Sequence, residues 1–280
     1  DIAELPDRTT RVLFCVPDDE LAAVARALAD HGASRRQTGS SCTDWIAAHV
    51  SGAHPAEVLA PLRACGAALL SIHPLQTFTS ATPPSAFTGI RMTIEGDAEA
   101  LSYGKALARL LGAMPQTLSS DAKPLYHLAA VLASNGLVAL LATAQHVWQA
   151  AGLDPDDAFA ALAPLVDATW ANVQRDGPAA LTGPAARGDA ETIATHLRAL
   201  QQAQASGTLS SLLSGASAEQ LYTTLTETML RIQQAHHALS DAEIRRVREH
   251  MQAARASSDT EGSFASEQEE ASSSNAAPAD

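Results

Sequence analysis

The sequence predicts an α/β domain built on a parallel sheet, followed by an all-helical domain. Over residues 1–117, short β-rich apolar runs alternate with helical segments, which is typical of a parallel sheet. From Asp121 onward no strand pattern occurs. Hydrophobic residues make up 46% of the 280 residues and aromatic residues only 4%, and this Ala- and Leu-rich composition favours helices. We therefore predict domains at 1–117 and 118–256, and a separate tail at 257–280.

The first domain is expected to alternate strands and helices in chain order. Strands are expected over 12–16 and 46–50, at the start of "AALLSIHPLQTF" and in "IRMTIEG". Helices are expected in "DDELAAVARALADHG", "PAEVLAPLRACG" and "DAEALSYGKALARLLG", where apolar residues recur at helical spacing. Elements of this length and order predict a parallel sheet with helical connections.

The second domain opens with about 30 residues of helix, "SSDAKPLYHLAAVLASNGLVALLATAQHVWQAAG", with Pro124 in the first turn. This helix is apolar almost all round, so we expect other helices to bury it. Further helices are expected in "DPDDAFAALAPLVDATWANVQRDG", "DAETIATHLRALQQA", "SAEQLYTTLTETMLRIQQA" and "SDAEIRRVREHMQAARA". The acidic, Ser-rich tail at 257–280 is expected to be disordered, because it has few large apolar residues to bury.

Several classes of function are not expected. The net charge is −13 and no segment makes a basic groove, so nucleic acid is not an expected partner. No uninterrupted apolar run reaches about 18 residues, so no membrane span is expected. Neither the three cysteines, at Cys15, Cys42 and Cys65, nor the ten histidines show metal-ligand spacing, so no metal site is expected. Reduced, buried thiols and the polar N-terminus predict a cytoplasmic protein.

The architecture suggests a dinucleotide-dependent reductase, but one expected motif is missing. A dinucleotide-binding domain begins with a strand, a Gly-x-Gly-x-x-Gly loop and a helix. No Gly-x-Gly occurs in the sequence, and the first strand ends in "VPDD", as a middle strand of such a sheet does. We therefore expect the first strands and the Gly-rich loop, which would hold the pyrophosphate, to be absent from this chain.

Three strand ends carry candidate binding residues, since ligands of open α/β sheets bind at the carboxyl ends of the strands. The candidates for cofactor binding are Val16, Pro17, Asp18, Ser51 and Gly52, and those for substrate binding are His73 and Gln76. Simpler interpretations remain for each stretch. Asp18 is also a candidate helix cap, "SG" a tight turn, and the His73 ring a donor to backbone.

The start of the long helix is the best candidate for chemistry. At 100° per residue, Lys123, His127 and Ser134 fall within about 40° of one another, Gln145 joins the stripe and Asn135 flanks it. Reduction of a C=O or C=N bond needs a proton donor near the developing anion, which His127 or Lys123 could supply. The alternative is a solvated Lys123 at the helix start and a His127 whose hydrogen bonds are satisfied in the core.

A loop in the second domain, "LTGPAARGDAETIATH", holds a further candidate. Arg187 could bind a carboxylate or phosphate with its planar fork of donors. Asp189 is expected to cap the following helix, with Thr192 three residues on. The alternative is that Arg187 only braces the loop by pairing with Asp189.

Five stretches together resemble one family. In order they are "VLFCVPDDELAAVA", "HVSGAHPAEVLAPLRACGA", "SIHPLQTF", "KPLYHLAAVLASNGLVAL" and "LTGPAARGDAETIATHLRAL". They resemble the Rossmann-like reductase-type proteins whose C-terminal half is the domain of unknown function 2520, over about residues 10–250. That family is similar to pyrroline-5-carboxylate reductase and the 6-phosphogluconate dehydrogenase superfamily. The resemblance implies a Rossmann-like domain that binds NADP or NAD and a 6-phosphogluconate-dehydrogenase-like helical domain, with functional Lys and Asn residues on its first helix.

The residues and the resemblance together predict an NAD(P)-dependent oxidoreductase acting on a small carbonyl or imine substrate in the cleft between the domains. His127 and Lys123 are the proton-transfer candidates, Asn135 and Arg187 the orienting ones, and Ser134 a further substrate contact. The alternative is a non-catalytic ligand-binding or dimerisation protein of the same fold. A homodimer through the helical domain is expected in either case, because such reductases often pair through buried apolar helices.

Overall fold

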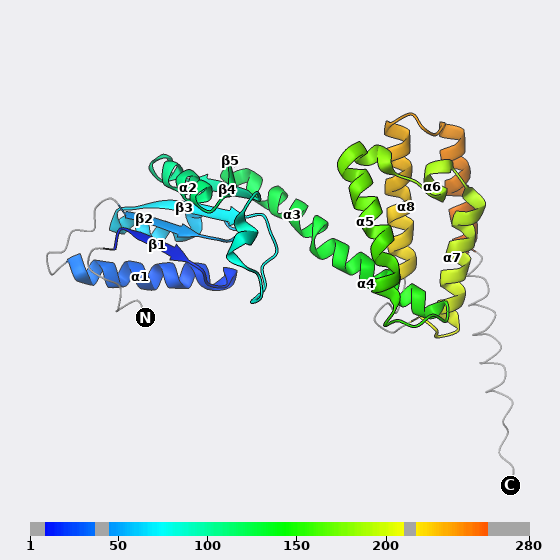
Figure 1. The fold of residues 1–280 in the computed structure, drawn as a ribbon, viewed down its shortest axis with the longest axis horizontal. Helices are drawn as coiled ribbons and strands as arrows, with labels where there is room; N and C mark the ends of the chain where they lie inside the picture. The colour runs from blue at the N-terminus through cyan, green and yellow to red at the C-terminus, as the bar shows by residue number, and fades with distance from the viewer. Residues whose placement is uncertain (1–8, 37–44, 210–216, 257–280) are drawn as a thin grey trace, which may run out of the picture. The chain divides into compact units, whose positions relative to one another are not determined.

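The computed structural model describes residues 9–36, 45–209 and 217–256. Contacts divide the chain into two compact units, Asp1–Leu137 and Val138–Asp280 (Figure 1). The first unit holds the sheet and the second is helical, which confirms the predicted fold class. The domain limits predicted at 117 and 256 remain a prediction, and the tail predicted to be disordered, 257–280, lies outside the described residues.

Within the described residues, five strands form one sheet in the order β1-β2-β3-β4-β5. The strands are β1 (Arg11–Phe14), β2 (Trp45–His49), β3 (Ala67–Pro74), β4 (Arg91–Gly96) and β5 (Met114–Thr117). Neighbouring strands run parallel except β3 and β4, which are antiparallel. The first four strands lie where the sequence predicts strands, whereas the antiparallel pair and β5 were not expected. β5 has only four residues, "MPQT", too few to show a periodic pattern.

Helices cover both faces of the sheet (Figure 1). On one face, α1 (Leu21–Arg36) and the 3₁₀ segment η3 (Ala56–Cys65) bury an apolar core that includes Leu59 and Leu69. On the other, α2 (Ala98–Leu110) buries a second core that includes Leu70 and Ile94. Successive residues of β3 thus point to opposite faces, as the two-residue period of a strand requires.

Two local predictions need correction. The stretch 55–66 was expected to be an ordinary helix but forms 3₁₀ turns, with Pro61 inside, where proline has no N–H to donate. The thiols were expected to be buried, yet Cys15 is exposed, while Cys65 is buried with its Sγ 3.5 Å from the Ala29 oxygen. Cys42 lies outside the described residues.

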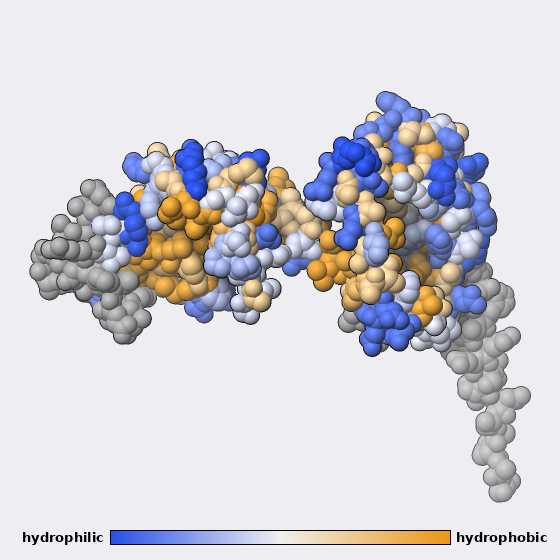
Figure 2. Space-filling view, viewed as in Figure 1, coloured by the Kyte–Doolittle hydropathy of each residue, from blue (hydrophilic) through white to orange (hydrophobic). Residues whose placement is uncertain are grey.

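The long apolar helix is broken and exposed, contrary to the sequence prediction. It consists of α3 (Lys123–Ala133) and α4 (Asn135–Ala150), separated at Ser134 (φ −111°, ψ −75°) just before the weak helix formers Asn135 and Gly136. Apolar side chains along it reach the surface (Figure 2), with Leu125 73% and Leu132 65% exposed. The stretch Ser120–Ala150 is long and apolar enough to cross a membrane by length and composition alone, and 0% of its apolar window is buried. A single helix of this kind is weak evidence, since the core helix of a soluble protein passes the same test.

The second unit is built from helices only among its described residues. They include α5 (Ala158–Asp176), the short η6 (Gly177–Ala180) and α6 (Pro184–Arg187), α7 (Ala190–Ala205), α8 (Ser217–Ala235) and a helix over 241–256. α6, α7, α8 and the helix over 241–256 share a core that includes Ile193, Leu197, Leu230 and Val247. As predicted, Asp189 caps α7, where its carboxylate accepts from Thr192 N at 3.1 Å.

Candidate functional site

A row of buried polar residues crosses the sheet beside the carboxyl ends of its parallel strands. The residue pairings run from Phe14 to His49, then to Ser71, then to Glu95. His49 and Ser71 are 0% exposed and Glu95 is 4% exposed. Paired residues project from the same face of a sheet, so these side chains lie next to one another on the face that η3 covers. A polar row in a sheet interior requires partners, and the next elements supply them.

Lys123, the first residue of α3, lies over this row and is 0% exposed. Its Nζ donates to Ser71 Oγ at 2.6 Å and to Ser51 O at 3.1 Å. Burial lowers the pKa of Lys123, while the nearby charges of Glu95 and Asp18 raise it. The interpretation of Lys123 as a solvated residue at the helix start is therefore wrong. Since an ammonium has three hydrogens, one is left over from these contacts with the described residues.

The turn after β2 is fixed by His49. Ser51 N donates to His49 Nδ1 at 3.1 Å, so Nδ1 is the acceptor and Nε2 carries the hydrogen that Pro55 O accepts at 3.2 Å. Burial first, and then the charge of Lys123, lower the pKa of His49 to about 4. His49 is therefore neutral at pH 7 and holds one tautomer. The sequence analysis did not select it.

The Ser51 hydroxyl organises the same turn. It donates to Asp18 Oδ2 at 2.8 Å and accepts from Ala53 N at 3.2 Å and His54 N at 3.1 Å. The structure thus brings together the predicted residues Asp18, Ser51 and Gly52, and it also supports the tight-turn interpretation. Asp18 makes no capping bond with its side chain, since the cap position of the 3₁₀ turn Asp18–Glu20 is Pro17. Val16 packs on the core of α1 and η3.

Two imidazole rings pack against Gly52. A Cβ at this position would lie 2.7 Å from both His73 Nε2 and His127 Nδ1, closer than real Cβ atoms come to other atoms. Only glycine therefore fits between the rings, whose centroids are 6.3 Å apart. His73 bonds through Nδ1 to the Tyr126 hydroxyl at 2.8 Å and not to backbone, and its role in binding substrate remains a prediction.

Burial shifts the pKa values of His73 and Tyr126 in opposite directions. Burial first, and then the charges of Lys123 and His127, lower the pKa of His73 to about 4, so His73 is neutral at pH 7. Burial also raises the pKa of Tyr126. His127 Nδ1 is buried and has no hydrogen-bond partner among the described residues, so the protein side chains and backbone described do not satisfy it. A buried ring nitrogen without a partner calls for a ligand or a water.

The other predicted site residues lie elsewhere. Gln76 is exposed and accepts from Thr77 N at 2.8 Å in its own loop. Beyond the break at Ser134, Asn135 is exposed at the start of α4, and Gln145, in the second unit, donates to Pro155 O at 2.9 Å. Arg187 is exposed at the end of α6 in the second unit. The roles proposed for these residues remain predictions.

Sequence reasoning missed several members of this site, namely His49, Ser71, Glu95 and Tyr126. One signal was available for two of them, because His49 and Ser71 each follow a run of apolar residues in their strands. What could not be read from the sequence is that the three positions are neighbours, since this depends on strand order and register. We refer to Ser51, Ser71, His73, Lys123, Tyr126 and His127 as the Lys123 cluster.

Comparison with known proteins agrees with this architecture. A family model described as a Rossmann-like domain matches residues 1–74, and one described as the domain of unknown function 2520 (DUF2520) matches residues 90–229. The chain belongs to the DUF2520 family. The second match begins at β4, so the family domain includes Glu95, Lys123 and His127 from the site. No curated protein matches the chain.

Solved structures resemble this member of the DUF2520 family over most of its length. A protein from Thermotoga maritima is 24% identical, with a TM-score of 0.61, and the match covers 81% of this chain and 78% of that one. A candidate NADP oxidoreductase from Bacteroides fragilis is 23% identical, with a TM-score of 0.62 and coverage of 82% and 79%. A reductive aminase from Aspergillus terreus, in complex with NADPH and ethyl levulinate, is 18% identical, with a TM-score of 0.48 and coverage of 82% and 75%. At these identities the comparison establishes the fold.

The turn after β2 is not itself built to hold a pyrophosphate. The Ser51 hydroxyl hydrogen is donated to Asp18, and a carboxylate at Asp18 repels phosphate oxygens. Two polar groups here lack a partner among the described residues, namely one hydrogen of Lys123 and the His127 Nδ1. No chemical step through a bound nucleotide is derived from these residues.

Proposed function

We propose that this DUF2520 protein is an NAD(P)-dependent oxidoreductase acting on a small carbonyl or imine substrate. The observation that carries the proposal is the buried ammonium of Lys123 among neutral imidazoles at the carboxyl ends of the strands. The Rossmann-like fold is consistent with it. A reduced nicotinamide, when bound, would supply the hydride, and the residues of this chain bind, orient and protonate the substrate.

The proton donor in this proposal is Lys123. His49 and His73 are neutral at pH 7, so the positive charge next to them is that of the Lys123 ammonium. Its remaining N–H can donate to the substrate oxygen or nitrogen that becomes negative during reduction. Burial lowers the pKa of Lys123 toward the working pH, which makes proton transfer easier. Ser71 Oγ and Ser51 O hold the amine in place.

Histidine and tyrosine complete the binding surface. His127 Nδ1, which lacks a partner among the described residues, is proposed to bond to the substrate. The hydrogen bond to Tyr126 holds the His73 ring in place beside the His127 ring. Asn135 and Arg187, exposed in this structure, are kept as proposed orienting residues, with Ser134 and Gln76 as proposed substrate contacts.

The test uses the absorbance of NADPH and NADH at their reduced band with a panel of small oxo acids and cyclic imines. We expect at least one substrate of the panel to cause oxidation of NADPH or NADH. Lys123→Met should lower kcat/KM by about 10²–10⁴-fold. Lys105, the other lysine of the sequence, provides the matched control Lys105→Met, which should retain activity. Failure of the chain to bind or oxidise either nucleotide would refute the oxidoreductase proposal.

A specific observation favours the alternative, a dimerising ligand-binding protein. The α3 face that carries Leu125, Leu128 and Leu132 is exposed by 73%, 49% and 65%. Leucines spaced at i, i+3 and i+7 form a stripe along one side of a helix, and a second copy of this chain is the proposed cover. An enzyme can also be a dimer. A dimer therefore supports the non-catalytic alternative only if the chain also shows no redox activity.

Light scattering tests the dimer. The wild-type chain should have twice the monomer mass, and Leu128→Glu together with Leu132→Glu should give a monomer because burying two carboxylates is costly. Leu110→Glu, at an 83% exposed position on α2, is the control and should remain dimeric. A monomeric wild type would exclude this assembly.

A further inference from the structure

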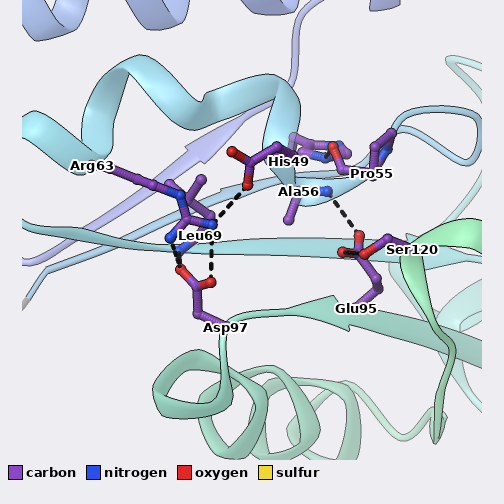
Figure 3. A network of polar contacts seen from close by, with 9 residues as sticks. His49, Pro55, Ala56, Arg63, Leu69, Glu95, Asp97 and Ser120 are labelled. Atoms are coloured by element: carbon purple, nitrogen blue, oxygen red, sulfur yellow. Dashed lines mark hydrogen bonds and ion pairs between the residues drawn. The ribbon is translucent and has the colours of Figure 1, made fainter.

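The buried carboxylate of Glu95 ties together the two segments that hold Lys123. Its Oε2 accepts from Ala56 N at 2.7 Å, and its Oε1 accepts from Ser120 Oγ at 2.6 Å (Figure 3). Ala56 begins η3, directly after the turn whose Ser51 O accepts from Lys123. Ser120 lies three residues before Lys123. One side chain therefore fixes both the acceptor turn and the start of the donor helix.

The surroundings of Glu95 are unusual for a structural carboxylate. Glu95 is 4% exposed, and its two hydrogen bonds in the described structure come from neutral donors. Neutral donors offset only part of the cost of burying a charge, so a nearby cation is needed. Ser71, directly opposite Glu95 on β3, is the residue that accepts from Lys123 Nζ, which places the ammonium over the same row.

Asp97 shows what a different carboxylate on the same segment does. It lies two residues after Glu95, also accepts from a backbone N–H, Leu69 N at 2.7 Å, and also reaches η3, through Arg63 at 2.8 Å (Figure 3). Arg63 is 44% exposed, so this ion pair lies at the surface. Asp97 thus braces η3 against β3 without a role at Lys123, and it offers a control on the same segment as Glu95.

We propose that Glu95 is a positioning residue for Lys123, holding the amine against Ser51 O and Ser71 Oγ and supplying its counter-charge. The proposal rests on the proposed function in one respect, that Lys123 is the proton donor of the oxidoreductase. The charged and titratable groups around the amine are Glu95 on β4, Asp18 after β1, His49 on β2, His73 on β3 and His127 on α3. Among the carboxylates, burial favours Glu95 as the stronger influence, because Asp18 is exposed to water.

The sequence makes a direct measurement possible, because it contains two lysines, Lys105 and Lys123. Protein labelled with ¹³C at lysine Cε gives one NMR signal for each, and Lys105→Arg assigns them. Titration of the Lys123 signal with pH reports the pKa of its amine without any substrate or cofactor. We expect Glu95→Gln, which keeps the size and most hydrogen bonds but removes the charge, to lower that pKa by about one unit, a tenfold change in proton affinity.

Two further variants separate positioning from general stability. Asp97→Asn should destabilise the unit yet leave the Lys123 titration unchanged, and Glu95→Asp, which keeps the charge, should restore most of the pKa. An equal effect of Glu95→Gln and Asp97→Asn would overturn the proposal. If Glu95→Gln does not fold, Ser120→Ala decides. Loss of the hydrogen bond from Ser120 to Glu95 should let water reach the amine and raise the pKa of Lys123. An unchanged titration would overturn the proposal.

These measurements are independent of turnover. A shifted Lys123 titration in a chain that oxidises no nucleotide would uphold the role of Glu95 and refute the oxidoreductase. An active enzyme in which Glu95→Gln leaves the Lys123 titration unchanged would uphold the oxidoreductase and refute the role of Glu95. In an active enzyme, Glu95→Gln should also move the basic limb of the kcat profile to lower pH, because the proton donor Lys123 would deprotonate earlier, and Asp97→Asn should not.

Discussion

Replacing His49 by asparagine should change how the stability of the sheet unit depends on pH. The His49 ring is 0% exposed, and its pKa falls from 6.5 to about 4 in the folded chain. A group whose protonation is disfavoured in the folded state contributes its full stability above the unfolded pKa. That stability is lost as the pH falls from about 6.5 to 4, because the unfolded chain takes up the proton first.

The size of the effect follows from the shift. A difference of 2.5 units between the two states corresponds to a loss of about 3 kcal/mol between pH 7 and pH 4. Asparagine keeps an acceptor near the position of Nδ1 for Ser51 N but loses the bond to Pro55 O, which costs about 1–2 kcal/mol at pH 7. The wild type should therefore be the more stable protein at pH 7, and His49→Asn the more stable one at pH 4.

The assay must report the sheet unit alone, since a chain of two units need not unfold in one step. Trp45 lies in β2 at 7% exposure, whereas Trp148 and Trp170 belong to the second unit. In a Trp148→Phe, Trp170→Phe background, the fluorescence of Trp45 follows denaturant unfolding of the sheet at pH 4, 5, 6 and 7. The titration of His73 is present in both proteins and cancels in the comparison.

A control variant at exposed His236 tests for any general effect of losing an imidazole. The reasoning predicts converging and then crossing curves of unfolding free energy against pH for wild type and His49→Asn. Parallel curves from pH 7 to pH 4 would show that His49 is not held neutral by burial, and the electrostatic description of the site would be refuted.

Three further variants test the packing and capping of the chain. Gly52→Ala should cost about 1–3 kcal/mol, measured by denaturant unfolding, because its Cβ would lie 2.7 Å from two imidazole nitrogens; an unchanged stability would contradict the close packing. Gly104→Val should cost a similar amount, because even its Cβ would lie 2.9 Å from Ile94 Cγ2; a more stable variant would show that α2 can move away. Asp189→Ala should cost about 1 kcal/mol through loss of the cap to Thr192, seen as a lower melting temperature of the second unit, with Asp189→Asn as the conservative control.

Much of the architecture could be predicted because its signals are local. The apolar run at 45–48 and the alternation of strands and helices depend on side-chain periodicity, which neighbouring residues set. The cap at Asp189 depends on a side chain and an N–H three residues apart. These features were therefore predicted correctly without knowledge of the rest of the chain.

Other features depend on residues far apart in the sequence, and prediction failed there. The antiparallel direction of β4 and the addition of β5 depend on which edges pair, which no local pattern encodes. The helix over 119–152 was predicted to be continuous, but it breaks at Ser134, and the stripe of candidate residues is divided with it. Its apolar character was interpreted as a sign of burial, whereas this chain leaves those side chains exposed.

The sequence by itself determined that the chain has an α/β unit and a helical unit, and that Lys123 and His127 are one helical turn apart and so on one side of α3. Only the tertiary structure decided what surrounds them. Ser51, Ser71 and Glu95 meet Lys123 because three strands lie side by side in one register, over separations of 28 to 72 residues. The electrostatics of the site follow from that meeting, because burial, which depends on the whole fold, lowers the pKa of Lys123, His49 and His73.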